Sequence, residues 1–208
     1  MTEASSYSLG SLIGGRLALD FANAGSAKHP LSWEELILFL EATQVISSQR
    51  SKLLLELPES DPVGAQALLE RAAKLRSGMR QVFHGLVRHE TPKAEHVEPV
   101  NVVLRVTEGH DELVLRDGSW KIEFVAREGG LEWLLAAIAR SAAEIAGEGP
   151  KARVRLCANP DCGLFFYDDS RTRKRRWCSM AVCGNRHKVA SFARKHGNRG
   201  RGRTSGQS

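Results

Sequence analysis

The chain has 208 residues, 42% of them hydrophobic, and its formal net charge at pH 7 is +6. This size allows one domain with a buried core and a small additional module, and no apolar run approaches the roughly 20 residues of a membrane span, which excludes an integral membrane protein. The first ten residues, MTEASSYSLG, have neither the basic nor the apolar region of an export signal, so we expect a cytoplasmic protein with reduced thiols.

The first patterned segment follows this polar leader. Leu17, Leu19 and Phe21 alternate with smaller residues, which favours a strand, although a short helix through the same residues also fits. Gly14 and Gly15 precede them without the full spacing of a phosphate-binding loop, so we interpret this glycine pair as a turn.

Three helical segments are predicted next. Ser32 and Glu35 have the spacing of a capping box, which starts a helix there. Leucines at 53–57 predict a second, short helix. Asp61 and Pro62 supply an N-cap and a first-turn proline for a long helix that runs to about residue 88. Its predicted apolar stripe contains Leu68, Leu75, Met79, Val82 and Leu86.

A small antiparallel sheet is expected after this helix. Residues 92–99 begin and end with proline and are interpreted as a linker, and the β-branched residues 100–106 are interpreted as a strand. A two-residue Asp117-Gly118 turn within 112–125 predicts a hairpin. Its register places five large apolar side chains on one face: Leu113, Leu115, Trp120, Ile122 and Phe124.

Residues 131–146 predict one more helix, with an apolar face that starts at Leu134. Residues 1–150 are therefore expected to form an α+β domain, in which helices accompany a small antiparallel sheet that includes the hairpin 112–125. This part has 15 basic and 21 acidic residues, and its net charge of −6 would repel nucleic acid.

Three tryptophans of this domain lie on separate predicted elements. Trp33, Trp120 and Trp133 either pack in the core or line a pocket for a small-molecule effector. We expect the domain to sense such an effector or to mediate assembly, including formation of a homo-oligomer.

All four cysteines lie in the C-terminal part of the chain, as Cys157-x4-Cys162 and Cys178-x4-Cys183 with fifteen residues between the pairs. Two local pairs of thiolates match the tetrahedral preference of zinc, and a site with four cysteines leaves no open position for substrate. We therefore predict one structural Zn²⁺ per chain. Two disulfides are disfavoured because no export signal is present, while an iron–sulfur cluster or redox cysteines remain alternatives.

The segment 151–208 carries 15 basic residues and three acidic ones, for a net charge of +12 that favours a polyanionic partner. Arginine can bind phosphate or a guanine edge through two parallel hydrogen bonds. Nucleic-acid contacts are predicted for the loop before the second cysteine pair and for the helix after it: Arg171, Arg173, Lys174, Arg175, Arg176, Arg186, Lys188, Arg194 and Lys195.

Short strands are predicted at 151–156 and 164–167, and a basic helix from Cys183 to about 196 with Val189 and Phe192 on its inward side. Two cysteine pairs, a hairpin and a last ligand at a helix N-terminus describe a treble-clef-like finger at 151–197. The aromatic residues Trp177, Phe165 and Phe166 either form a small core over the metal or stack on bases. The Gly/Arg-rich stretch 198–208 is expected to be a disordered basic tail.

Three short motifs of this segment resemble the CGNR zinc finger: Asp168-x-Ser170, the run RRWCSM at 175–180 and Cys183-Gly184-Asn185-Arg186. The run GGRLALDFAN at 14–23 resembles the opening of the ABATE domain, which accompanies this finger in bacterial proteins described as stress-induced transcription regulators. The resemblance implies a DNA-binding transcription regulator.

The sequence also bears on two other classes of function. The chain has no HExxH motif, no nucleotide-binding loop and no Ser/His/Asp set that spacing brings together, so we predict no enzyme. His84 and Arg88 share a helix face and Asp20 is expected to be partly buried, but His84 is interpreted as an exposed polar residue of its helix. A finger that binds RNA or a protein partner is the main alternative to one that binds DNA.

Overall fold

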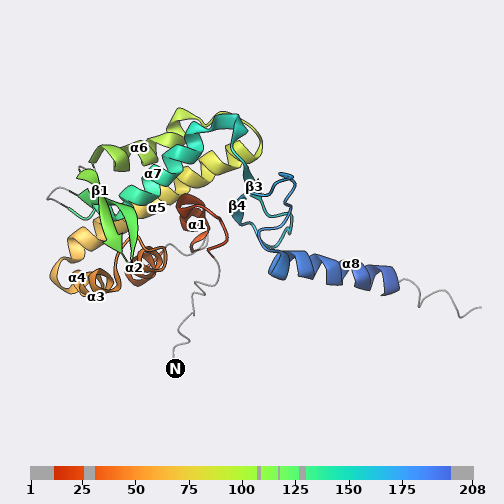
Figure 1. The fold of residues 1–208 in the computed structure, drawn as a ribbon, viewed down its shortest axis with the longest axis horizontal. Coiled ribbons are helices and arrows are strands. Elements are labelled where there is room, and N and C mark those ends of the chain that lie inside the picture. Colours follow the sequence, from red (N-terminus) through yellow and green to blue (C-terminus); the bar gives the residue numbers. More distant parts are fainter. Residues whose placement is uncertain (1–11, 26–30, 107–108, 117, 127–129, 198–208) are drawn as a thin grey trace, which may run out of the picture.

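The computed structural model describes residues 12–25, 31–106, 109–116, 118–126 and 130–197. Helices form a body at one end of the molecule, the cysteine-rich finger lies at the other end, and the last helix extends away from both (Figure 1). The helices are α1 (Leu17–Asn23), α2 (Trp33–Ala42), α3 (Ser48–Leu55), α4 (Leu57–Ser60), α5 (Pro62–Val87), α6 (Ala94–Val106), α7 (Trp133–Gly147) and α8 (Asn185–Gly197). Within the described residues, no helix is long and apolar enough to cross a membrane.

Two antiparallel strand pairs complete the fold, β1 (Gly109–Arg116) with β2 (Ser119–Ala126) and β3 (Val154–Leu156) with β4 (Phe165–Tyr167). A helix-rich N-terminal region with a small antiparallel hairpin, followed by a four-cysteine finger, confirms the predicted fold class.

The segment predicted as a strand near the N-terminus is the helix α1, so the helical alternative is confirmed. Ala18, Leu19, Phe21 and Ala22 are all fully buried. A strand would have turned the two alanines away from Leu19, whereas α1 is buried on several sides because it packs against α5, α7 and β4.

The predicted starts of α2 and α5 are confirmed. The Ser32 hydroxyl accepts from the Glu35 amide at 3.1 Å and the Glu35 carboxylate accepts from the Ser32 amide at 2.8 Å. The Asp61 carboxylate accepts from the Gly64 amide at 2.8 Å. The predicted apolar stripe of α5 is buried throughout: Leu68, Leu75, Met79, Val82 and Leu86.

The predictions of a linker at 92–99 and of a strand at 100–106 were wrong, because most of this segment is the helix α6. Val100 and Val103 have helical spacing and both are buried, so packing overrides the β-propensity of the valines. Pro99 lies inside the helix against α5. A Cβ added to Gly78 would lie 2.8 Å from the Pro99 ring, so the glycine permits the close contact between α5 and α6.

The hairpin has the predicted register, with Leu115 opposite Trp120 and Leu113 opposite Ile122. Gly118 provides the positive φ of the turn, at +76°. The shared apolar face of these four residues is exposed, however, and Trp120 is 68% accessible. The side chain of Phe124 lies outside the described set.

The helix predicted at 131–146 is α7, with Leu134, Leu135 and Ile138 in the core. Helices α5, α6 and α7 lie side by side across the body (Figure 1). On the face toward α1, the Ser141 hydroxyl accepts a hydrogen bond from the Ala18 amide at 3.2 Å.

The strand pair β3–β4 belongs to both parts of the molecule. Val154, Phe165 and Tyr167 lie in the core of the helical body, whereas Phe166 packs with the cysteines. Because successive side chains of a strand point in opposite directions, β4 contributes alternately to the two cores. The predicted domain division at 150/151 therefore falls where the buried core continues from the helices into the finger.

Candidate zinc centre and basic surface

The four cysteine sulfurs form one compact cluster. All four Sγ atoms of Cys157, Cys162, Cys178 and Cys183 lie within 4.8 Å of one another, and Cys162 and Cys178 are 3.6 Å apart. A tetrahedral zinc with Zn–S bonds of about 2.3 Å places its sulfurs roughly 3.8 Å apart. The donor set and its spacing fit zinc, and among the described residues this is the one such group of potential ligands.

The titration of these thiols depends on burial and on one another. Burial raises the pKa of Cys162 to about 11, and burial together with the neighbouring cysteines raises the pKa of Cys178. Burial also acts on Cys157, but the amides of Cys178 and Asn159 donate to its sulfur and bring its pKa below the ordinary value. A divalent cation at the centre would favour the thiolate form of all four cysteines, so its binding would release protons.

Cys178 precedes a turn of π-helix, Met180–Gly184, which contains Cys183 and leads directly into α8. The Ser179 hydroxyl caps this turn by accepting from the Val182 amide at 3.4 Å. Cys183 is thus held at the start of the helical segment, as the treble-clef-like arrangement predicts. The side-chain amide of Asn159, between the first two ligands, lies 3.6 Å from the sulfur of Cys183.

Asp168 organises the loop that carries the basic residues. It is fully buried and accepts hydrogen bonds from the Ser170 amide at 3.1 Å, the Ser170 hydroxyl at 2.5 Å and the Arg175 amide at 3.0 Å. Burial alone would raise the pKa of Asp168, but these hydrogen bonds and the charge of Arg155 lower it. The carboxylate therefore stays ionised and fixes the two ends of the loop.

Arg175 is placed inside the finger. Its Nε donates to the Trp177 carbonyl at 2.9 Å, a second guanidinium nitrogen donates to the Cys178 carbonyl, and the charge lies 4.6 Å from the centre of the Phe166 ring. These contacts hold the segment that carries the third ligand. Sequence spacing alone did not separate this arginine from its neighbours in the loop.

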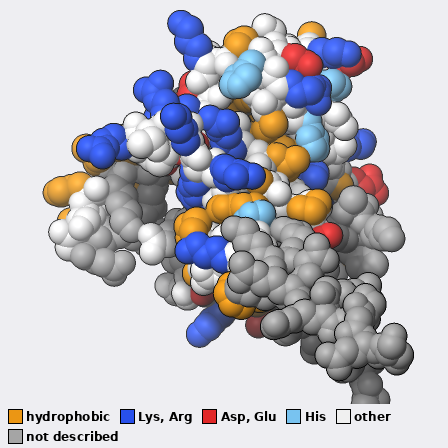
Figure 2. Space-filling model, turned by 90° about the vertical axis from the view of Figure 1, so that its right-hand side faces the viewer, with side chains coloured by type: hydrophobic (Ala, Val, Ile, Leu, Met, Phe, Trp, Pro, Cys, Tyr) orange, Lys and Arg blue, Asp and Glu red, His pale blue; other side chains and the backbone are white. Residues whose placement is uncertain are grey.

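The other predicted contact residues lie on the surface. The side chains of Arg171, Arg173, Lys174, Arg176, Arg186 and Lys188 are exposed, while those of Arg194 and Lys195 lie outside the described set. On the face seen in Figure 2, which is the right-hand side of Figure 1, Lys and Arg side chains gather around the finger and acidic side chains lie mainly at the edges.

The aromatic residues of the finger are divided between two cores, Phe165 in that of the helical body and Phe166 and Trp177 with the cysteines. Phe165 and Phe166 are both 0% exposed, so neither is available for stacking on a base. Trp177 is half-buried next to the cysteines, and its ring centre lies 4.7 Å from that of His187 on α8. This packing supports the interpretation of Trp177 as part of the core over the metal.

The inward side predicted for α8 was wrong. Val189 is 69% exposed and Phe192 is 64% exposed, because the helix extends away from the body (Figure 1), and neither belongs to a buried cluster of the described residues. The apolar spacing on its own does not tell a buried helix face from an exposed one.

The N-terminal motif at 14–23 binds the finger. The Tyr167 amide donates to the Gly14 carbonyl at 2.8 Å, and the guanidinium of Arg16 lies 4.3 Å from the centre of the Tyr167 ring. Asn23 forms two hydrogen bonds with the backbone of Phe165. Sequence reasoning did not assign Asn23 a role, and the only signal for it was the resemblance of its motif to the ABATE opening.

Two titratable groups considered for catalysis have structural contacts. Asp20 is half-buried, as predicted, and accepts from the Gly14 amide at 2.7 Å; burial raises its pKa. His84 is half-buried and its ring centre lies 4.8 Å from that of Phe165, so it belongs to the contact with the finger and is not an exposed helix residue. Burial first, and then the charges of Arg80 and Arg88, lower the pKa of His84.

Of the two alternatives for the three tryptophans, core packing holds for Trp33 and for Trp133, which packs partly buried against the core, whereas pocket lining holds for none of them. Trp33 is buried and donates to the Leu54 carbonyl at 2.7 Å, Trp120 is exposed on the hairpin, and Trp133 lies under the guanidinium of Arg50 at 4.9 Å. None of the three lines the pocket that the helical body contains elsewhere.

Comparison with protein-family models gives two adjoining matches. Residues 15–149 match the ABATE model, described as "Putative stress-induced transcription regulator", and residues 153–196 match the CGNR zinc finger. The two matches agree with the resemblances seen in the sequence and identify the cysteine cluster as the structural zinc site of this finger. No curated protein gives a significant match.

Proposed function

Because the chain belongs to the ABATE family and carries a CGNR zinc finger, we propose that it is a DNA-binding transcription regulator whose finger contacts the DNA. In this function the protein catalyses no reaction. The zinc has a structural role, since four cysteine ligands leave no coordination position for a substrate.

One observation supports this function: exposed Lys and Arg side chains lie on the loop and the helix next to the zinc cluster. Arg171, Arg173 and Lys174 lie on the loop that Asp168 organises, Arg176 follows it directly, and Arg186 and Lys188 continue the positive surface onto α8. Cations on an ordered loop lose less conformational entropy on binding than cations on a flexible tail. Phosphate contacts from the loop would position the protein, and α8 would enter a groove of the duplex.

Arg175 has a different role in this proposal. It contacts the finger backbone and the Phe166 ring, so it supports the loop from within and leaves the phosphate contacts to the exposed residues around it.

The proposal is tested with zinc-loaded full-length protein and labelled duplexes from a genomic pool, using fluorescence anisotropy. The double variant Arg171→Gln/Arg176→Gln should weaken binding by about tenfold or more and reduce the salt dependence by about two counterions. Lys52→Gln/Lys74→Gln, which removes two exposed cations from the helical body, is the matched control. Equal losses in both variants would contradict a role for the finger loop.

RNA and protein partners are the alternatives to DNA. Competition between duplex DNA, single strands and RNA at matched salt tests the RNA alternative. Duplex DNA should displace the labelled duplex better than single strands or RNA of equal length. If RNA displaced the labelled duplex more strongly than duplex DNA does, RNA would be the partner in place of DNA.

For the helical body, we propose a regulatory role, either in sensing a small molecule or in assembly. Assembly is favoured by the exposed apolar face of the hairpin, formed by Leu113, Leu115, Trp120 and Ile122. Light scattering tests it: Trp120→Ser should shift a homo-oligomer toward the monomer, whereas a wild-type protein that is monomeric at high concentration would leave sensing as the role of the body.

A further inference from the structure

The helical body contains an apolar pocket of about 370 Å³ between α5, α6 and α7. Its size falls within the ordinary range of small-molecule sites. The walls are made mainly of aliphatic and aromatic side chains, among them Met79 and Phe83 from α5, Val100 from α6, and Ala142, Ala143 and Ala146 from α7.

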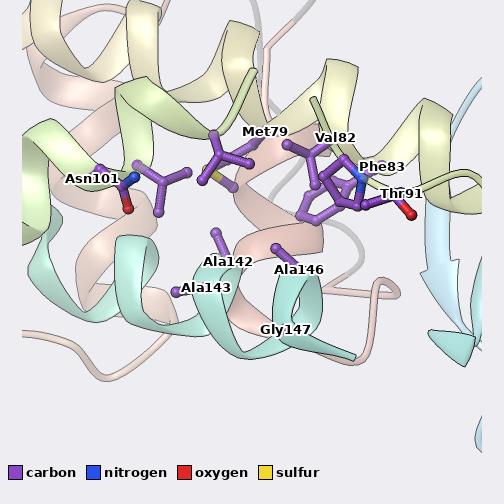
Figure 3. Close-up of a pocket in the computed structure, with 12 residues that line it drawn as sticks. Met79, Val82, Phe83, Thr91, Asn101, Ala142, Ala143, Ala146 and Gly147 are labelled. Atoms are coloured by element: carbon purple, nitrogen blue, oxygen red, sulfur yellow. The ribbon is translucent and has the colours of Figure 1, made fainter. Parts of the chain in front are cut away.

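The pocket exists because α7 presents alanines toward α5 and α6, and these side chains are too small to fill the space (Figure 3). The Asn101 amide lies at one end of the pocket and the Thr91 hydroxyl at the other (Figure 3). None of the lining residues carries a charge. A charged ligand would lose its hydration without a partner, so the pocket suits an uncharged molecule with an apolar body and a hydrogen-bonding group at an end.

The wall of the pocket also contacts the finger. Phe83 lines the pocket, and its ring centre lies 5.9 Å from that of Phe165 in an edge-on contact. Phe165 belongs to β4, and the next residue, Phe166, packs against Cys157, Cys178 and Cys183. One aromatic contact and one strand therefore join the pocket to the zinc core.

We infer that this pocket binds a small uncharged apolar molecule and that occupancy is transmitted to the finger through Phe83, Phe165 and β4. A ligand packed against Phe83 restricts the ring that supports Phe165, and this restriction orders the strand from which the zinc core is built. The consequence for DNA affinity rests on the proposed function, whereas binding and ordering of β4 do not.

Binding is tested on the zinc-loaded full chain with N-phenyl-1-naphthylamine, an uncharged dye whose fluorescence rises in apolar surroundings. Wild type should bind one equivalent saturably. Ala146→Phe, which fills the pocket, should weaken binding by about tenfold or more. Glu144→Phe, which adds the same side chain on the exposed side of α7, should bind like wild type. Ala143→Leu, a smaller filling substitution, serves if Ala146→Phe does not fold, as judged by circular dichroism.

Transmission is tested by hydrogen exchange with and without saturating dye and without DNA. The amides of Phe165 and Tyr167 donate to Asn23 and to the Gly14 carbonyl, so their exchange reports opening of β4. Exchange of the peptide 154–167 should slow several-fold more than exchange of α3, which only reports global stabilisation. The pocket assignment is overturned if the dye does not bind or if the filling variants bind it as wild type does. Equal slowing in both peptides overturns the transmission, and loss of DNA binding alone affects only the proposed function.

Discussion

The side chain of Asn23 pairs with the backbone of Phe165 through two hydrogen bonds. Its Nδ2 donates to the Phe165 carbonyl at 2.8 Å, and its Oδ1 accepts from the Phe165 amide at 2.9 Å. The amide group thus satisfies both polar groups of a strand residue whose side chain is fully buried. Arg80 supports the same contact, because it donates to the Ala22 carbonyl at 2.9 Å and its guanidinium lies 5.2 Å from the centre of the Phe165 ring.

Replacing Asn23 by alanine should loosen the junction between helical body and finger. The substitution leaves the amide and the carbonyl of Phe165 without their partner, at a cost of about 2–4 kcal/mol in the free energy of unfolding. Urea unfolding followed by circular dichroism measures this change. Gln66→Ala, which removes an exposed amide that bonds to Glu70 at 3.1 Å, should change stability by less than about 0.5 kcal/mol. Similar effects of the two substitutions would contradict the role of Asn23.

Arg175 and Arg176 are neighbours in the chain, but their substitution should have different effects. Arg175→Ala removes charge-assisted hydrogen bonds to the Trp177 and Cys178 carbonyls, so it should destabilise the finger by about 1.5–3 kcal/mol and speed zinc release to a chelator. Arg176→Ala removes an exposed cation, so zinc release should stay as in wild type while DNA binding weakens. The prediction fails if both variants retain zinc equally.

Asp20→Asn should change the pH dependence of stability. Burial raises the folded-state pKa of Asp20 above its ordinary value of 3.8, so the folded protein binds the proton more tightly than the unfolded chain. Its contribution to stability is therefore present at low pH and is lost as the pH rises through the folded-state pKa. The asparagine oxygen can still accept from Gly14, so the variant should be more stable than wild type at neutral pH. This advantage should disappear as the pH falls toward 3.8. An advantage independent of pH would rule out the titration of Asp20 as its cause.

Removing zinc should affect more than the finger. Phe165 and Tyr167 are part of the core of the helical body, so loss of metal should lower the melting temperature of the helical signal by at least about 4 °C, a change of roughly 1–2 kcal/mol for a chain of this size. Circular dichroism of reduced protein before and after chelation measures it. Zinc added back at one equivalent should restore the melting temperature, and an unchanged helical signal would show that the two cores are independent.

Several features could be predicted from residues close together in the chain. The capping box of Ser32 and Glu35, the Asp61 cap, the Asp117-Gly118 turn and the spacing of the cysteines each depend on local geometry, and the structure has the elements that they predict. The positive charge of the finger loop was also evident, since charge composition does not depend on the fold.

Only the tertiary structure decided the features that depend on distant partners. Residues 17–23 and 94–106 are helices because their neighbours bury several sides of α1 and one face of α6, and packing outweighs the local preference of alternating or β-branched residues. The same holds for Val189 and Phe192, whose spacing fits a buried helix face although both side chains are exposed. The role of Asn23 and the position of Arg175 also depend on partners brought close by folding, so the sequence determined the metal and the charge of the finger, and packing determined how the finger joins the helical body.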